Sequence, residues 1–357
     1  MYLILPVAGL STRFPNVRPK FLLTHPNGHL MLTESISGIK YVQDTFKQII
    51  IISLKEYEKK YKFSKELLKE LKTVYPSIKT KILLLDKPTK NQPETISKAI
   101  EKYKLGGGIF IKDSDNYFKF DSKYKNNFVV VSDLHKLSKI NASNKSYVNI
   151  GIKNTVSNIV EKKIIGNLFC CGGYYFKEAK DFLSVYKELS KTNDNLYISH
   201  IIYQMLLNKQ IFFAEEATNY IDWGTLEDWM EYKKQFGTIF IDIDGTLVMN
   251  GGQHCTPKWG ELGSIPENIK IINKMYDTGK IYVVLTTSRP LSPYSTYITF
   301  KQIKKYKIKY HKILFDLPHA RRILINDHAK SNPYPSAIAI NLERNSNKLE
   351  EMLNYEQ

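Results

Sequence analysis

Hydrophobic and polar residues follow two different periods along the first 110 residues of the chain. Short continuous hydrophobic runs are typical of buried strands, whereas hydrophobic positions that recur every three or four residues are typical of helices. The pattern predicts a series of alternating elements: strands over residues 2–7, 48–54, 81–85 and 108–112, and helices over 33–45, 64–75 and 93–103. Because strands that alternate with helices form βαβ units, we expect a mostly parallel sheet.

Farther along the chain the pattern changes twice. From residue 128 to residue 176 the apolar runs become shorter, which indicates a region of mixed sheet, and helices are predicted over 176–190, 197–208 and 225–235. Near Gly237 the alternation starts again, with these predicted elements: strands over 238–241, 280–286, 322–325 and 337–340, a helix over 266–277, and a helix or frayed tail after Arg344. We therefore predict an α/β fold with two domains, residues 1–236 and a smaller one over 237–357.

Length and composition agree with this division. At about 150 residues per domain the 357 residues correspond to two domains, or to one large one. Hydrophobic residues make up 43% and charged residues 24%, which excludes a wholly disordered or fibrous chain. No apolar run approaches the ~20 residues of a membrane helix, so we expect no membrane partner. The first residues lack the basic stretch of a cleaved signal.

The cysteines indicate a reducing compartment. Cys170, Cys171 and Cys255 are too few for a disulfide framework, and their spacing is not that of a zinc site. We therefore expect a cytoplasmic protein.

The net charge of +17 has two readings. It could serve a polyanionic partner, either nucleic acid or the phosphates of a nucleotide. It could equally be compositional, because the excess consists mostly of lysines spread along the chain, without a compact basic stripe that alternates with aromatic residues. We favour the second reading and expect no nucleic-acid partner.

The loop after the first predicted strand has the composition of a phosphate-binding loop. Ala8, Gly9 and Ser11 are small, so their backbone N–H groups could wrap around a triphosphate at the carboxyl end of the strand. Arg13 and Lys20 follow and could neutralise charge on the phosphates. The loop is neither a Walker A motif nor GxGxxG, which argues against a P-loop ATPase or a classical dehydrogenase.

Two aspartates follow other predicted strands. Asp115 follows the strand at 108–112, and Asp222 lies at a strand-to-helix turn. Magnesium is commonly held by one or two carboxylates together with phosphate oxygens, so Asp115 and Asp222 are a candidate metal pair. Taken singly, each could instead be a turn or N-cap residue.

These motifs together resemble a known family. The opening LPxAGxSxRF with Pro19-Lys20, the strand that ends near Asp115, the Glu161-Lys162 segment and the late Asp222-Trp223-Gly224-Thr225 occur in the order found in sugar-phosphate nucleotidyltransferases of the nucleotide-diphospho-sugar pyrophosphorylase type. The resemblance covers about residues 1–235. It implies a Rossmann-like nucleotidyltransferase domain with a mixed sheet.

The resemblance also implies roles for individual residues. The loop with Ala8, Gly9 and Ser11 would bind a nucleoside triphosphate, and Gln92 would read the base. Arg13 and Lys20 would stabilise the transition state, Asp115 and Asp222 would hold Mg²⁺, and Lys162 would contact the phosphate of a phosphorylated sugar or polyol. The opening has a single glycine where the family has several, which leaves the base and the acceptor open.

The segment FIDIDGTL at residues 240–247 is the most specific motif of the chain. Asp242 ends a hydrophobic strand, where a carboxylate can attack phosphorus and form an aspartyl-phosphate. Asp244 can protonate the leaving group and later activate water. An EF-hand also begins Asp-x-Asp, but the residues after Thr246 lack the further oxygen ligands that it needs.

Later segments complete an ordered set. Thr287 follows the predicted strand at 280–286, and Asp327 follows the one at 322–325. The set resembles the haloacid dehalogenase (HAD) superfamily of phosphatases over about residues 237–345, with no room for a large cap domain. The resemblance implies Asp242 as the nucleophile, Asp244 as the general acid and base, and Thr287 as a phosphate anchor. It also implies Mg²⁺ held by Asp242, the backbone carbonyl of Asp244, and Asp327. The family's basic residue is open among these candidates: Arg321, which we prefer for substrate phosphate, Arg322, Lys312 and Lys330.

Together the two halves predict a bifunctional enzyme of capsule or surface-glycan precursor biosynthesis. One domain would transfer a nucleotidyl group from a nucleoside triphosphate, and the other would hydrolyse a phosphate monoester. The alternatives are a nucleic-acid end-processing phosphatase and a nucleotide-binding regulator with degraded activity. Homo-oligomers are compatible with the sequence.

Overall fold

The computed structural model describes residues 1–121, 123–137 and 141–355. The chain forms two compact units, Met1–Trp229 and Met230–Gln357, which divide within helix α8 (Leu226–Lys234). None of the helices in the described ranges is long and apolar enough to cross a membrane.

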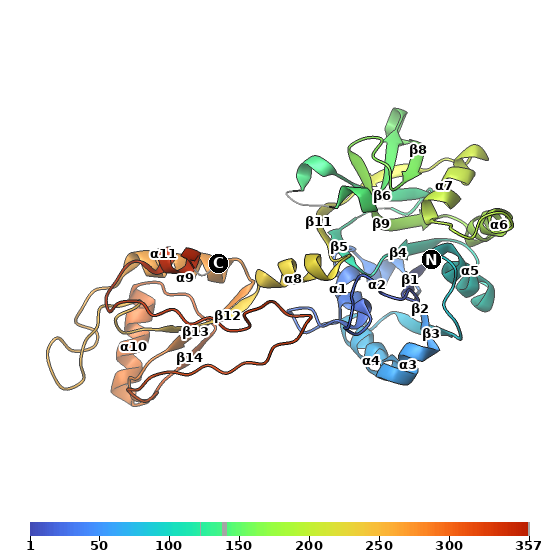
Figure 1. Ribbon diagram of the computed structural model, residues 1–357. Coiled ribbons are helices and arrows are strands. Elements are labelled where there is room, and N and C mark those ends of the chain that lie inside the picture. The colour runs from blue at the N-terminus through green and yellow to red at the C-terminus, as the bar shows by residue number, and fades with distance from the viewer. Residues whose placement is uncertain (122, 138–140, 356–357) are drawn as a thin grey trace. The chain divides into compact units, whose positions relative to one another are not determined.

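A mixed sheet runs through the first unit (Figure 1). Across the described residues its strands lie in this order: β10 (Phe213–Glu216), β6 (Phe128–Asp133), β9 (Leu168–Phe176), β4 (Ile109–Lys112), β1 (Tyr2–Pro6), β2 (Gln48–Leu54) and β3 (Lys79–Leu85). The four strands from β4 to β3 are parallel, whereas β9 is antiparallel to both β4 and β6. A hairpin of β7 (Ser146–Ile150) and β8 (Val156–Glu161) joins this sheet through β9.

Helices cover both faces of the sheet. Those of the first unit are α1 (Met31–Ser37), α2 (Val42–Thr45), α3 (Lys55–Tyr61), α4 (Ser64–Val74), α5 (Gln92–Tyr103), α6 (Ala179–Leu189) and α7 (Ile198–Leu207), with short 3-10 turns at Lys20–Leu22, Leu134–Lys136, Ala142–Asn144 and Ile152–Asn154. Alternate side chains of a strand point to opposite faces, so Leu3 and Leu5 join one buried cluster with Leu67 of α4. Ile4 joins a second cluster with Ile96 of α5. The sheet therefore separates two cores.

A separate two-stranded ladder brings distant parts of the chain together. Strand β5 (Asn116–Lys119) pairs antiparallel with β11 (Thr218–Asp222), so that Asp222 lies opposite Asn116. In addition, the N–H of Trp223 donates to the carbonyl of Asp115 at 2.9 Å. The ladder therefore places Asp222 beside the loop that follows strand β4.

Most elements predicted for the first unit are confirmed, but the helix expected over 33–45 is wrong. The chain forms two helices, α1 and α2, with a break after Gly38. The reason is a competing strand-like contact: the carbonyl of Gly38 accepts from the N–H of Phe120, and the N–H of Lys40 donates to the carbonyl of Phe120. Hydrophobic periodicity does not reveal such a long-range pairing.

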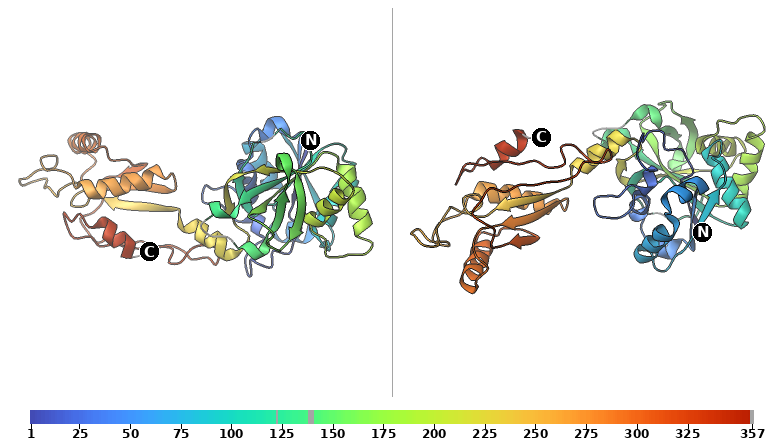
Figure 2. Two further views of the ribbon diagram at one scale, coloured as in Figure 1. Left: turned by 90° about the horizontal axis from the view of Figure 1, so that it is seen from above. Right: turned by 60° about the horizontal axis from the view of Figure 1, so that its bottom comes forward.

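The second unit contains three parallel strands in the order β12 (Gly237–Asp242), β13 (Ile281–Thr286) and β14 (Lys312–Leu314). Helices α9 (Pro266–Asp277) and α10 (Pro293–Lys305) connect them, and α11 (Leu349–Tyr355) packs against α9. The core contains Ile241, Ile269 and Leu285. Figure 2 shows these elements from two further sides.

The strands predicted over 322–325 and 337–340 are wrong. Between β14 and α11 the described chain has neither helix nor strand, and Figure 2 shows it as a long irregular stretch. The apolar run at Ile323, Leu324 and Ile325 is exposed rather than buried. A hydrophobic run forms a strand only if its backbone pairs with a neighbouring strand. Here β13 is already paired with β12 on one side and with β14 on the other, so residues 322–325 cannot pair with it.

The break after Gly38 provides a test of the packing under the β5–β11 ladder. A Cβ atom at Gly38 would overlap the carbonyl oxygen of Phe118 on β5. We therefore expect Gly38→Ala to destabilise the first unit by about 1–3 kcal/mol, measured by urea denaturation with tryptophan fluorescence. Gly106→Ala is the matched control, because a Cβ there has no atom within 4 Å. Equal midpoints for the two variants would contradict the expectation.

Candidate active site

A cavity of about 370 Å³ opens in the first unit where strands β1 and β4 end. Its lining comes from the loop after β1, the loop after β4, the β7–β8 hairpin, strand β9, the start of α7 and the end of β11. Polar ends of parallel strands meet at this edge, which is the usual ligand site of an open α/β sheet.

Asp115 is held between two cations. Its Oδ2 lies 2.5 Å from Lys20 Nζ and 3.4 Å from Arg13 Nη2. Burial by itself would raise the pKa of Asp115, but Lys20, followed by Arg13 and Lys145, outweighs burial and holds that pKa below its ordinary value. Asp115 therefore stays ionised, as a metal-binding carboxylate must.

Asp222 lies on the facing strand of the ladder and also has a cation partner. Its Oδ2 is 2.5 Å from Lys145 Nζ, and its Oδ1 accepts from the N–H of Gly224 at 3.0 Å. A Cβ placed on Gly224 would lie 3.0 Å from Asp222 Oδ1, 3.3 Å from Arg13 Nη1 and 3.8 Å from Asp115 Oδ2. The structure thus gathers three residues singled out from the sequence, Arg13, Asp115 and Asp222, around one point.

These two carboxylates fit a magnesium ion. Mg²⁺ commonly takes one or two carboxylates and completes its shell with water and substrate phosphate oxygens. Asp115 and Asp222 supply such a pair at the edge of the cavity. No group of three or more His, Cys, Asp and Glu side chains in the described part of the chain could hold a metal by itself.

A buried lysine that the sequence analysis did not single out braces the loop after β4. Lys112 Nζ donates to the carbonyl of Asp113 at 2.6 Å, and to the carbonyl and Oδ1 of Asn116 at 3.0 and 2.6 Å. Burial lowers the pKa of Lys112 to about 8, although Asp113 and Asp115 act in the opposite direction. The sequence signal was a lone lysine that ends an apolar strand directly before two aspartates.

Gln92, predicted to read the base, lines the cavity beside Asp113. Its Nε2 donates to Asp113 Oδ1 at 2.6 Å, from the first residue of α5. Burial, and then the neighbouring carboxylate of Asp115, raise the pKa of Asp113 to about 6. Asp113 is therefore a carboxyl group of the cavity whose pKa lies closer to neutral pH than that of a free aspartate.

The loop expected to bind the triphosphate follows β1 directly. Ala8 is buried, whereas Gly9 is exposed and faces open space. Ser11 has the left-handed φ of 51°, and Tyr57 donates its hydroxyl to the carbonyl of Gly9 at 2.9 Å. One face of the loop is therefore fixed to α3, and the other is open.

The opposite end of the cavity is formed by the β7–β8 hairpin and helix α7. Glu161 Oε2 accepts from the hydroxyls of Ser146 and Ser199, the latter at 2.7 Å. Lys162 Nζ donates to the hydroxyl of Tyr197 at 2.6 Å. Lys162 thus lines the cavity, beside Lys145 of the same hairpin.

The first unit has the mixed α/β fold of the nucleotidyltransferases that make sugar nucleotides. Similar solved structures include the nucleoside-diphosphate-sugar pyrophosphorylase from Vibrio cholerae RC9, with 19% identity, 64% of this chain and 98% of that chain covered, and a TM-score of 0.53. The inositol-1-phosphate CTP transferase from T. maritima has 16% identity, 64% and 90% coverage, and a TM-score of 0.51. A UDP-glucose pyrophosphorylase complexed with UDP-glucose has 15% identity, 65% and 98% coverage, and a TM-score of 0.50.

At these identities the likeness shows the fold. Met1–Trp229 makes up the same share of the chain as the region that these structures cover. No family model and no curated protein matches the sequence.

The second unit holds a carboxylate clamp at the end of β12. Arg289, which is almost fully buried, donates from Nε to Asp244 Oδ2 at 2.9 Å and from Nη2 to Asp244 Oδ1 at 2.6 Å. The Thr287 hydroxyl donates to Asp244 Oδ2 at 3.3 Å, and Arg289 Nη1 donates to Thr299. The sequence analysis missed Arg289, although it follows Thr287 closely in the segment TTSRP.

Asp242 lies beside a different arginine. Arg322 Nη2 is 3.2 Å from Asp242 Oδ1, so the basic residue that the structure places here is Arg322 rather than the preferred Arg321. Arg321 is exposed and has no ion pair within the described ranges. Burial raises the pKa of Asp242 to about 6, while Arg322 opposes this and Asp244 adds to it.

The predicted set of three metal ligands in this unit is not assembled. Asp327 is exposed in the irregular stretch after β14, because the strand expected to carry it does not form. Among the described side chains of this unit, no group of three or more His, Cys, Asp and Glu residues could hold a metal. Of the predicted ligands, Asp242 and the backbone carbonyl of Asp244 lie at the end of β12 and just after it.

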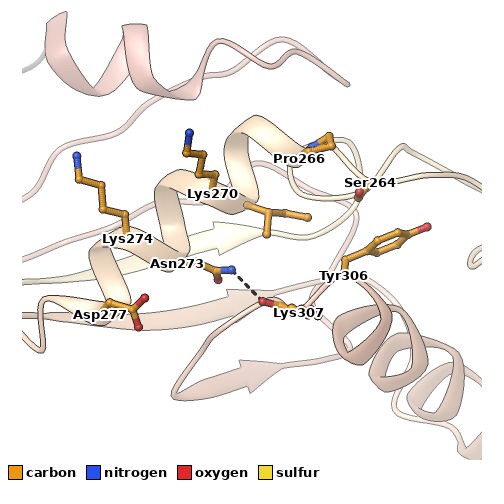
Figure 3. A pocket seen from close by; sticks show the side chains of 9 residues that line it. Ser264, Pro266, Lys270, Asn273, Lys274, Asp277, Tyr306 and Lys307 are labelled. Atoms are coloured by element: carbon orange, nitrogen blue, oxygen red, sulfur yellow. Dashed lines mark hydrogen bonds between the residues drawn. The ribbon is translucent and has the colours of Figure 1, made fainter.

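A groove of about 580 Å³ in the second unit lacks comparable chemistry (Figure 3). It lies between α9 and the end of α10, where Asn273 donates to the carbonyl of Lys307 at 2.9 Å. Lys270 and Lys274 point away from Tyr306 in this view. Asp277, at its end, is paired with Lys309 at 2.6 Å.

The clamp on Asp244 predicts a large loss of stability when its cation is removed. Arg289→Met would leave a partly buried carboxylate without its cation, which typically costs about 3–5 kcal/mol. Thermal and urea unfolding of the full chain measure the loss. Arg321→Met, at an exposed position, is the control and is expected to change stability by less than about 0.5 kcal/mol. If both variants unfolded at the same midpoint, the clamp would have no structural role.

Proposed function

We propose that the first unit transfers a nucleotidyl group from a nucleoside triphosphate to a phosphorylated sugar or polyol and releases pyrophosphate. The observation that carries this proposal is the meeting of Arg13, Lys20 and Asp115, which follow the parallel strands β1 and β4, with Asp222, which the antiparallel β5–β11 ladder places beside them. The fold shared with pyrophosphorylases agrees with it.

In the proposed reaction an acceptor phosphate oxygen attacks the α-phosphorus in line. A new P–O bond forms, and the bond from the α-phosphorus to the pyrophosphate oxygen breaks. Arg13 and Lys20 neutralise the charge that develops on the leaving group, and the open loop at Gly9 presents backbone N–H groups. Asp115 and Asp222 would hold Mg²⁺, which neutralises phosphate charge when bound.

Gln92 and Lys162 both line the cavity, and we propose the roles that the resemblance implies for them. Gln92 contacts the base, and Lys162 contacts the acceptor phosphate. The base itself stays open, because the neighbours' names mention both CTP and UDP-glucose. We propose a cytoplasmic enzyme that makes an activated precursor of capsule or surface glycan, with the domain boundary between residues 236 and 237.

A second activity, hydrolysis of a phosphate monoester, is proposed for the second unit. It rests on Asp242 and Asp244 at the end of β12, and on Arg289, which orients Asp244. Asp242 attacks phosphorus, the bond to the ester oxygen breaks, and an aspartyl-phosphate is left. For Asp244 to protonate the departing oxygen it must first take up a proton and leave the pair with Arg289, which holds it as a carboxylate. Asp244 then takes a proton from the water that attacks this intermediate, and inorganic phosphate is released.

The first activity is tested by following pyrophosphate release. The full chain is incubated with CTP, UTP, dTTP, GTP or ATP and a panel of phosphorylated sugars and polyols, with Mg²⁺. We expect one combination to be active, and Lys20→Ala to lower its rate by at least about 100-fold, because a charge-stabilising group at the leaving phosphate is lost. Asp242→Asn should retain full pyrophosphate release. Failure of every combination would refute the proposal.

The second activity is tested with p-nitrophenyl phosphate and with the phosphorylated sugars of the same panel. Asp242→Asn is expected to reduce phosphate release to background, because the amide cannot act as the nucleophile. Lys20→Ala, which alters only the first unit, should leave this hydrolysis unchanged. Silencing of both activities by either substitution in a folded protein would contradict two separate sites.

A further inference from the structure

Lys145 and Lys162 lie opposite each other at one end of the β7–β8 hairpin. The N–H of Lys162 donates to the carbonyl of Lys145 at 3.0 Å, directly beyond the paired residues Ser146 and Glu161. Both lysines line the cavity of the first unit. We name these two residues the lysine pair.

The side chain of Lys145 extends from this hairpin to the acidic side of the cavity. Its Nζ lies 2.5 Å from Asp222 Oδ2 and donates to the hydroxyl of Tyr220 at 2.7 Å, and only 14% of the side chain is exposed. It lines the cavity together with Asp115 and Asp222. Lys145 therefore connects Asp222 to the strand end that carries Lys162.

An anionic acceptor entering this cavity meets an electrostatic problem. A phosphate monoester carries a charge of about −1.5 to −2 at neutral pH, and it must approach Asp115 and Asp222 to reach the α-phosphorus. Lysine acts as a point charge, so Lys162 alone cannot balance a dianion. Lys145 stands beside Asp222 and can offset the repulsion between that carboxylate and the incoming phosphate.

We propose that Lys145 binds the acceptor phosphate together with Lys162, and that the lysine pair selects dianionic phosphomonoesters as acceptors. This inference rests on the proposed function of the first unit. Within the described residues Glu161 forms no ion pair with either lysine; its Oε2 accepts from the hydroxyls of Ser146 and Ser199 instead. Lys145 thus acts on the acceptor, whereas Lys20 acts on the triphosphate side.

The test compares Lys145→Gln and Lys145→Arg with the wild type, using the best acceptor of the panel. Loss of a charged hydrogen bond predicts a fall of about 10- to 100-fold in kcat/KM for the acceptor, with KM for the triphosphate within about threefold. Lys145→Arg keeps the charge and should recover part of the loss. Lys163→Gln is the matched control, because Lys163 is exposed on the same hairpin and does not line the cavity. It should behave as the wild type.

Calorimetry with inorganic phosphate gives a readout that does not depend on turnover. Wild type and Lys163→Gln should bind phosphate more tightly than Lys145→Gln, and should prefer phosphate over its monoanionic dimethyl ester. An unchanged acceptor KM with a shifted Mg²⁺ requirement in Lys145→Gln would show that Lys145 serves Asp222 alone, and would overturn the inference while leaving the proposed function intact. If the wild type releases no pyrophosphate with any combination of triphosphate and acceptor, the proposed function is refuted. Equal phosphate affinities in wild type and Lys145→Gln would refute the role of the lysine pair, whatever the result for pyrophosphate.

Discussion

Several carboxylates share one partly buried cavity in the first unit, and their mutual repulsion must be offset before any ligand arrives. Lys20 does this for Asp115 and Lys145 does it for Asp222, each at 2.5 Å. The short β5–β11 ladder makes both pairings possible, because it fixes Asp222 opposite Asn116. Without this ladder the two acidic residues would belong to separate parts of the unit.

In the second unit, too, a cation offsets the charge of a partly buried carboxylate. Arg289 reaches both oxygens of Asp244 with its planar guanidinium, so the carboxylate is fixed in position as well as neutralised. Asp242 has only one contact from Arg322, at the exposed rim, and burial leaves its pKa raised. The two aspartates of one short motif therefore have different surroundings.

The sequence predicted much of this arrangement because motifs at strand ends are local. Arg13, Lys20 and Asp115 follow their strands directly, and the parallel alternation of the first 110 residues placed those strand ends at one edge. Lys145 and Arg289 were not predicted, because their roles follow from their contacts with Asp222 and Asp244, which no local motif indicates. The strand expected over 322–325 failed for a related reason: hydrophobicity indicates that a segment can be a strand but does not name its partner. The HAD-like interpretation of the second unit and the individual roles of the site residues stay predictions.

The pairing of β5 with β11 also has a consequence for how the protein matures. It joins segments that lie about 100 residues apart in the chain, so a long loop must close before the ladder can form. During synthesis Asp115 leaves the ribosome before Asp222, and β11 is the last strand of this unit in the chain. The pair of carboxylates can therefore be complete only after the whole sheet has been translated.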